Sequence, residues 1–550
     1  MELIWNERNG ARVVYCGVAQ ALVEGEVPQL QDRLADTILS ATGDVVLLGL
    51  ETAEGCVRMG GEIRLQLICQ DASGVFAFTS RAAFRHTVQT EGVATGMLVR
   101  GVPALQSMEV QLSDGRITLH AVADITLRVV DHGPVKALCG LEGVPDLEMQ
   151  CQNISLPKRE EVFREVLPIR EEVDAPGVEA VLQRDVLIAL RDIQPGEQGT
   201  ELSGSLTLSA LVQDQEGRLF QLHQNIPFTE NLEVRGEAEY RAELALEEIR
   251  VRAAPEFGLV VVEGRLKVCL YAVRTWEAQL PQDLFSPSTP FSCQQETLRL
   301  SGELGPVNHR HTLHETVNIP SGMPEAQRVV YCAVRPVITA AAVNQERLCM
   351  EGLLVTRILY EGAEGNIYAF TEDIPFETDC PAPDATEAMA SAGATAIASG
   401  SGRALEVSYT LQIQAELSIQ QPHVLVTGVT ECERAELAQG IVVYFAGAGE
   451  TLYDVAKRFA IPRSALRAAL GGRQGRIGGG AAAGIPALSR MARCPWVLLK
   501  KRLWAAFSGC FCRGRQGWAW PGGGRRVRWA HPAAGRPEAA PRPVWGRSPA

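Results

Sequence analysis

Three stretches of the chain alternate apolar and polar residues on both sides of a short polar turn. In each copy, one glycine opens the first alternating run and a second glycine follows in the turn at the same spacing. The glycine pairs are Gly61 and Gly74, Gly204 and Gly217, and Gly352 and Gly365. Because alternate side chains share one face of a strand and glycine accommodates the positive φ of a tight turn, each copy predicts a β-hairpin. The second and third copies close on Ile-Pro-Phe, at residues 226–228 and 374–376, which we expect to end a strand.

A further alternating run follows each hairpin, at residues 117–127, 259–270 and 405–417. Several strands per copy are typical of a small β domain. The sequence therefore predicts a mainly β fold with three tandem β-rich modules. We place these modules at residues 1–140, 141–290 and 291–435.

Two segments within the modules follow other patterns. In the first module, Pro28 precedes apolar residues spaced four apart from Leu30 to Ile38, which predicts an N-terminal helix. In the third module, residues 388–402 are rich in Ala, Ser and Gly, and we expect a flexible surface loop there. The arms between modules contain several prolines, which favour edge strands or extended connectors.

Beyond the third module, the alternation gives way to a short apolar run and then to helical spacing. Thr451 is a suitable helix N-cap, and Asp454 stands where a capping box places an acidic residue. The next apolar residues fall on one helical face; they are Leu452, Val455, Ala456 and Phe459. We therefore predict a small α+β unit of the βααβ type at residues 440–470. We expect this unit to be incomplete, or to extend to about residue 486 with an altered closing strand, because no regular closing strand follows the second helix.

Charge divides the chain into two parts. The formal net charge is −13, but residues 471–550 contain many arginines and a single acidic residue, Glu538. Residues 1–470 are therefore strongly acidic, which disfavours binding to nucleic acid or anionic lipid. No apolar run is long enough to span a bilayer and no secretory signal is visible, so we expect a cytoplasmic protein without a transmembrane segment. The basic tail is rich in Gly, Arg and Trp and lacks hydrophobic periodicity, so we expect it to be disordered or out of frame.

The sequence contains no phosphate-binding loop, no nucleophile elbow and no zinc-protease motif. We therefore expect no enzyme, no catalytic residues and no cofactor. One cluster, residues 309–315, has the residue types that bind metals. On a strand, His309 and His311 share a face with Glu315 while His314 points away, so we expect a solvated arm and no metal site.

The helical unit resembles a LysM module. The matching residues are Tyr444, Gly449, Glu450, Thr451, Leu452, Val455, Ala456, Phe459 and Leu466. This resemblance implies that two loops bind either a protein partner or a glycan containing N-acetylglucosamine. The candidate binding residues are Gly449, Glu450 and Thr451 in the first loop, and Ile461, Pro462 and Arg463 between the helices. The chain departs from the LysM pattern at Leu470, where the family usually has Asn.

Three β-rich modules followed by a LysM-like end resemble the spore coat assembly proteins of the SipL and SpoVID kind, whose repeated β domain is the SPOCS domain. This resemblance implies a non-enzymatic scaffold of sporulation, made in the mother cell and located at the forespore surface. It further implies that the LysM-like end docks onto the ATPase of the coat basement layer, and that the protein recruits other coat proteins. The alternative is a carbohydrate-binding protein whose LysM recognises peptidoglycan or spore cortex glycan.

Overall fold

The computed structural model describes residues 2–30, 33–236, 238–433, 441–447, 449–470 and 496–499. Strands make up most of these residues, which confirms the prediction of a mainly β fold. Within the same ranges, no helix has the length and hydrophobicity needed to cross a membrane.

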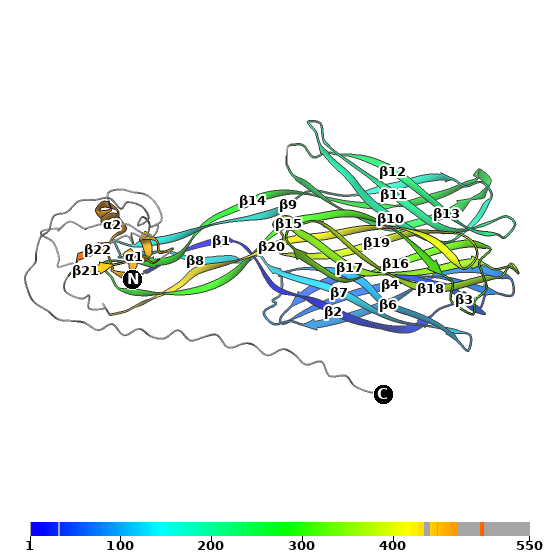
Figure 1. Ribbon diagram of the computed structural model, residues 1–550, viewed down its shortest axis with the longest axis horizontal. Helices are drawn as coiled ribbons and strands as arrows, with labels where there is room; N and C mark the ends of the chain where they lie inside the picture. Colours follow the sequence, from blue (N-terminus) through cyan, green and yellow to red (C-terminus); the bar gives the residue numbers. More distant parts are fainter. Residues whose placement is uncertain are drawn as a thin grey trace, which may run out of the picture.

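Most strands belong to three consecutive units with the same plan (Figure 1). In each unit, the second, third and fourth strands form one antiparallel sheet, and the first, sixth and fifth strands form another in that order. The first unit consists of β2 (Ala11–Val27), β3 (Thr37–Ala53), β4 (Cys56–Asp71), β5 (Gly74–Gln89), β6 (Leu98–Ser113) and β7 (Arg116–Asp131). The second consists of β9 (Glu148–Asp174), β10 (Val178–Pro195), β11 (Thr200–Asp214), β12 (Leu219–Leu232), β13 (Tyr240–Ala254) and β14 (Leu259–Phe285), with a short 3₁₀ turn η1 (Pro255–Phe257). The third consists of β15 (Phe291–Asn318), β16 (Arg328–Asn344), β17 (Arg347–Glu361), β18 (Ile367–Pro381), β19 (Glu387–Ser399) and β20 (Ala404–Glu431).

The three hairpins expected from the glycine spacing are present as β4–β5, β11–β12 and β17–β18. Their turn glycines have positive φ, with values of 119° at Gly74, 80° at Gly217 and 76° at Gly365. The expectation that Ile-Pro-Phe ends a strand is wrong, because both copies lie inside β12 and β18. These strands are sheet edges, where proline is tolerated because its missing N–H faces no partner strand.

The glycines that open the hairpins serve a different purpose from the turn glycines. Each lies opposite a phenylalanine on the next strand, in the pairs Gly61–Phe84, Gly204–Phe228 and Gly352–Phe376. A Cβ atom at Gly61 or Gly352 would lie 2.6 Å from the facing ring. The absence of a side chain therefore lets the aromatic ring cover the backbone of the middle strand. Phe84 takes this place in the first unit, which lacks Ile-Pro-Phe.

Two further predictions of local structure are wrong. The described residues between Pro28 and Ile38 form no helix, and Ile38 belongs to β3. Ile38 packs in the core of the first unit, while its neighbour Leu39 packs in the apolar cluster between units. These apolar residues are therefore buried in two different cores and do not form one face of a helix. Residues 387–399 form β19 instead of a flexible loop. Small residues are needed there, because a Cβ at Gly393 would lie 2.6 Å from the side chain of Leu187 in the second unit.

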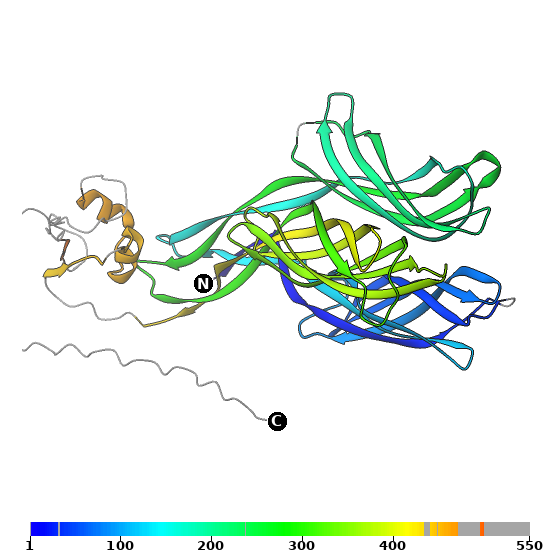
Figure 2. The ribbon, with the colours of Figure 1, turned by 45° about the vertical axis from the view of Figure 1, so that its right-hand side comes forward.

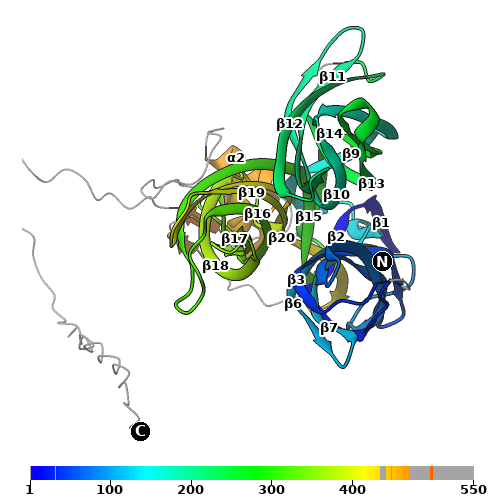
Figure 3. The ribbon, with the colours of Figure 1, turned by 90° about the vertical axis from the view of Figure 1, so that its right-hand side faces the viewer.

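The three units pack around a common axis, as the view along the long dimension of the molecule shows (Figure 3). At the same distance after each opening glycine, the hairpins carry Ile68, Leu211 and Leu359. All three side chains are fully buried and belong to one apolar cluster shared by the units. The equivalent positions of the three copies therefore meet on the axis, which buries their apolar surface from water.

An ionic network also joins the units. Arg159 of β9 contacts the Glu416 carboxylate of β20 at 2.7 Å and Glu303 of β15 at 3.6 Å. Arg100 of β6 lies 3.3 Å from each of the same two carboxylates. The guanidinium of Arg159 also stacks 4.0 Å from the centre of the Tyr271 ring. Two carboxylates of the third unit thus bind arginines from both of the other units.

Three two-stranded ribbons extend from the units on one side and form a feature that we call the stalk (Figure 2). One ribbon pairs β1 (Glu2–Asn9) with β8 (Pro134–Glu142). The others join the start of β9 to the end of β14, and the start of β15 to the end of β20. Apolar side chains from all three ribbons pack together inside the stalk, among them Leu138, Ile154, Leu280 and Leu425. Pro157 and Pro168 of the first arm lie in β9, an edge strand of its sheet, as expected.

The C-terminal end contains β21 (Ile441–Tyr444), α1 (Leu452–Arg458), α2 (Arg463–Ala469) and β22 (Trp496–Leu499). β22 lies within the basic tail and pairs with β21 in parallel. The rest of the tail from residue 471 to 550 lies outside the described residues, as does the expected extension to about residue 486.

Candidate docking site

A helix cap and a small core determine the local fold of the LysM-like end. The Thr451 hydroxyl accepts the N–H of Asp454 at 3.2 Å, and the Asp454 carboxylate accepts the N–H of Thr451 at 2.7 Å. This reciprocal arrangement satisfies two N–H groups that otherwise lack a partner at the start of α1. Val455, Ala456 and Leu466 are buried between the helices. The capping box predicted from the sequence is confirmed.

The first candidate loop is braced by Glu450. Its carboxylate accepts hydrogen bonds from the Tyr444 hydroxyl and from the N–H of Gly447, each with a contact of 2.7 Å, and it pairs with Arg458 at 3.1 Å. Gly449 has a φ of 88°, a conformation that glycine adopts without steric cost. The side chain of Glu450 therefore fixes the loop between β21 and α1 and is itself largely engaged.

The second candidate loop lies against the stalk. Pro462 precedes α2, and Ile461 packs on the small core of the end. The N–H of Arg463 donates to the Glu148 carboxylate at 3.1 Å, and the guanidinium of Arg463 pairs with the same carboxylate. Among the described residues, no hydrogen bond or ion pair links this loop to the first one. The two loops are thus held separately, one by its own unit and one by the stalk.

Three residues at the end of the stalk, which we call the stalk tip, receive the LysM-like end: Glu148 of β9, and Asp283 and Phe285 of β14. Lys457 of α1 pairs with the Asp283 carboxylate at 2.6 Å. The ring of Tyr453 meets Phe285 edge to face, with 5.2 Å between ring centres. Sequence reasoning missed the stalk tip, because these residues are far from the helices in the chain and carry no local signal.

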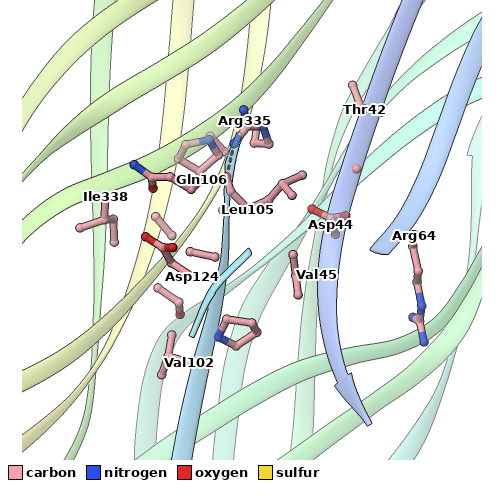
Figure 4. A pocket seen from close by; sticks show the side chains of 18 of the residues that line it. Thr42, Asp44, Val45, Arg64, Val102, Leu105, Gln106, Asp124, Arg335 and Ile338 are labelled. Atoms are coloured by element: carbon pink, nitrogen blue, oxygen red, sulfur yellow. Dashed lines mark hydrogen bonds between the residues drawn. The ribbon is translucent and has the colours of Figure 1, made fainter. Parts of the chain in front are cut away.

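A cavity of about 750 Å³ lies between the three units (Figure 4). Its walls include the second and fifth strands of every unit, so the packing of the units creates it. Charged residues of both signs line it; they are Asp44, Arg64, Arg81, Asp124, Arg184, Asp185, Glu248 and Arg335. No sequence pattern predicts this cavity, since its residues come together only through packing between units.

Burial changes the ionisation of the acids in this cavity. Asp185 accepts a hydrogen bond from the Tyr331 hydroxyl at 2.8 Å, yet burial raises the pKa of Asp185 to about 7. Burial also raises the pKa of Asp44, against the opposing effect of Arg335 and Arg64. Asp44 lies deep in the molecule but remains accessible, because its side chain faces the cavity. We therefore expect the charge of this contact region between units to change with pH.

The histidine cluster lies on β15. His309 shares a contact of 3.2 Å with the Thr378 hydroxyl, and its ring stacks on His311. His314 faces away and contacts Ser408 at 2.8 Å. In the part of the chain that the structure describes, no three His, Cys, Asp or Glu side chains come together as a metal site would require.

A comparison with protein-family models finds that residues 325–398 are similar to the model described as SipL, SPOCS domain. The matched range covers the second, third and fourth strands of the third unit and nearly all of the fifth. No curated protein and no solved structure matches the chain.

Proposed function

Starting from the similarity of residues 325–398 to the SPOCS domain, we propose that the chain is a non-enzymatic scaffold of spore coat assembly. The match supports a role in sporulation as a coat protein. The scaffold docks through its LysM-like end onto the ATPase of the coat basement layer, and it recruits other coat proteins. It acts in the mother cell, at the forespore surface.

The strand plan extends the proposal to the whole β region. The first and second units have the same order of strands as the third, and all three carry a glycine faced by phenylalanine in the central hairpin. Equivalent side chains also meet on the axis. We therefore propose that each unit is a SPOCS-like domain, and that the three form one rigid platform whose outer faces bind coat proteins.

The position of the LysM-like end supports docking of a partner there. The end lies at the far side of the stalk from the β units, where a large partner can approach it (Figure 1). A sugar-binding groove usually offers aromatic platforms. Here the Tyr444 hydroxyl is bonded to Glu450, and Tyr453 is buried against Phe285. Among the aromatic side chains that the structure describes at residues 441–470, this leaves Phe445 exposed, which favours a protein partner over a glycan.

The proposal is tested by location in sporulating cells. A fluorescent fusion of the full chain, produced in an endospore-forming host lacking its own copy, should form a shell around the forespore and restore the coat. A chain ending at residue 439 should stay diffuse in the mother cell. A diffuse full-length fusion would contradict the proposal. Capture of the full chain by purified cortex glycan, with no effect on the coat, would favour the carbohydrate-binding alternative.

A further inference from the structure

We propose that the stalk tip holds the LysM-like end in a masked state. In this state Glu148 forms an ion pair with Arg463, and Asp283 forms an ion pair with Lys457. Without the stalk tip, these two basic side chains would be free to bind an acidic surface of a partner. The inference deepens the proposed docking function and rests on it for the identity of the partner. The masking contact itself is a property of this chain alone.

Two ion pairs hold the end in place from different ribbon strands. Glu148 lies at the start of β9 and Asp283 near the end of β14, and these segments pair with each other in the stalk. The carboxylates are the more buried partners, with side-chain exposures of 18% for Glu148 and 16% for Asp283, against 37% for Arg463 and 40% for Lys457. The stalk tip thus presents two fixed negative charges to two more exposed basic groups.

Apolar contacts also join the stalk tip to the LysM-like end. Phe285 is 5% exposed and Tyr453 is 4% exposed, and both belong to the core cluster of the LysM-like end. Phe285 comes from β14, so the stalk supplies part of this core. Docking therefore buries apolar surface in addition to forming ion pairs, which gives the contact more strength than exposed ion pairs alone provide.

The contacts of Arg463 indicate which chemical group of a partner could displace the stalk tip. Arg463 uses both its guanidinium and its backbone N–H on one carboxylate. A partner that takes the second loop must break this arrangement, and an acidic side chain is the group that replaces Glu148 with the least loss. Because the masked state competes with the partner, weakening the stalk contact raises the fraction of chain ready to bind.

The contact can be tested without any partner by zero-length carbodiimide coupling of the full chain, followed by mass spectrometry. Lys457 and Asp283 are close enough to couple directly, so the wild-type chain should yield a Lys457–Asp283 cross-link. Glu148→Gln leaves both coupling groups intact but weakens the contact between the stalk tip and the LysM-like end. This variant should lower the yield of the Lys457–Asp283 cross-link at least twofold. The matched control Glu142→Gln removes an exposed carboxylate of the stalk and should leave the yield unchanged.

Masking is measured as the rate at which an arginine-selective dicarbonyl reagent modifies Arg463. The rate should rise about two- to fivefold in Glu148→Gln, the change expected from losing one partly exposed ion pair. Absence of the cross-link in the wild-type chain, or equal Arg463 reactivity in wild type and Glu148→Gln, would overturn the inference. If both readouts behave as expected but the coat ATPase binds neither chain, the docking function fails while the masked state stands.

Discussion

The ionic network between the units makes Glu416 a sensitive point of the fold. Its carboxylate contacts Arg159 at 2.7 and 2.9 Å and Arg100 at 3.3 Å, so it joins the third unit to both of the others. The side chain of Arg159 is only 4% exposed. Glu416→Gln keeps the size of the side chain but removes the charge that compensates this buried guanidinium.

The loss of stability in Glu416→Gln depends on which contacts of Arg159 remain. Removing one partner of a buried ion pair costs about 3–5 kcal/mol when the other charge is left uncompensated. In this chain Glu303 still lies 3.6 Å from Arg159, and the Tyr271 ring still covers the guanidinium. We therefore expect Glu416→Gln to lower the free energy of unfolding by about 2–3 kcal/mol.

Urea denaturation of the full chain measures this loss as a lower midpoint, and small-angle X-ray scattering reports whether the units separate. Glu431→Gln is the matched control, because Glu431 is an exposed carboxylate on the same strand and should change stability by less than about 0.5 kcal/mol. If Glu416→Gln and Glu431→Gln unfold at the same urea concentration, the assignment of the network as a link between units is wrong.

Three further predictions concern single side chains. Gly352→Ala places a Cβ against the Phe376 ring and the Val337 carbonyl, and should cost about 1–3 kcal/mol in thermal unfolding, whereas Gly49→Ala, which meets open space, should be nearly neutral. Phe459→Ala should cost the LysM-like end about 2–4 kcal/mol and expose it to limited proteolysis, while the β units keep their melting temperature. Folded Asp185, with its pKa raised to about 7, holds a proton that the unfolded chain loses near its ordinary pKa of 3.8. Stability should therefore fall as pH rises through that window, by at most about 1.4 kcal/mol per pH unit, and Asp185→Asn should flatten the dependence of melting temperature between pH 5 and 8.

The hairpins were predictable because their signal is local. Alternation and a turn glycine at fixed spacing determine a strand pair without reference to the rest of the chain. The contact on the axis is also partly visible in the sequence. The central strands carry adjacent apolar residues such as Leu67 and Ile68, which indicates that both faces of these strands are buried. That both faces are buried follows from the sequence, but which surfaces cover them does not.

The features that the sequence did not predict share one cause, which is packing between distant segments of the chain. Residues 388–402 look like a linker because they are small, yet their size is set by close approach of the second unit at Gly393. The loop position of Arg463 predicts that it binds a partner, but the residue that it contacts, Glu148, is more than half the chain away. Composition and spacing carry no information about such pairs, so the stalk, the cavity and the masked state required the structure.

Direct binding of the purified coat ATPase is the measurement that tests the central claim. Biolayer interferometry with the ATPase immobilised should show saturable binding of the full chain and none of a chain ending at residue 439. The same affinity for both chains would contradict docking through the LysM-like end, and no binding of either would contradict the proposed partner.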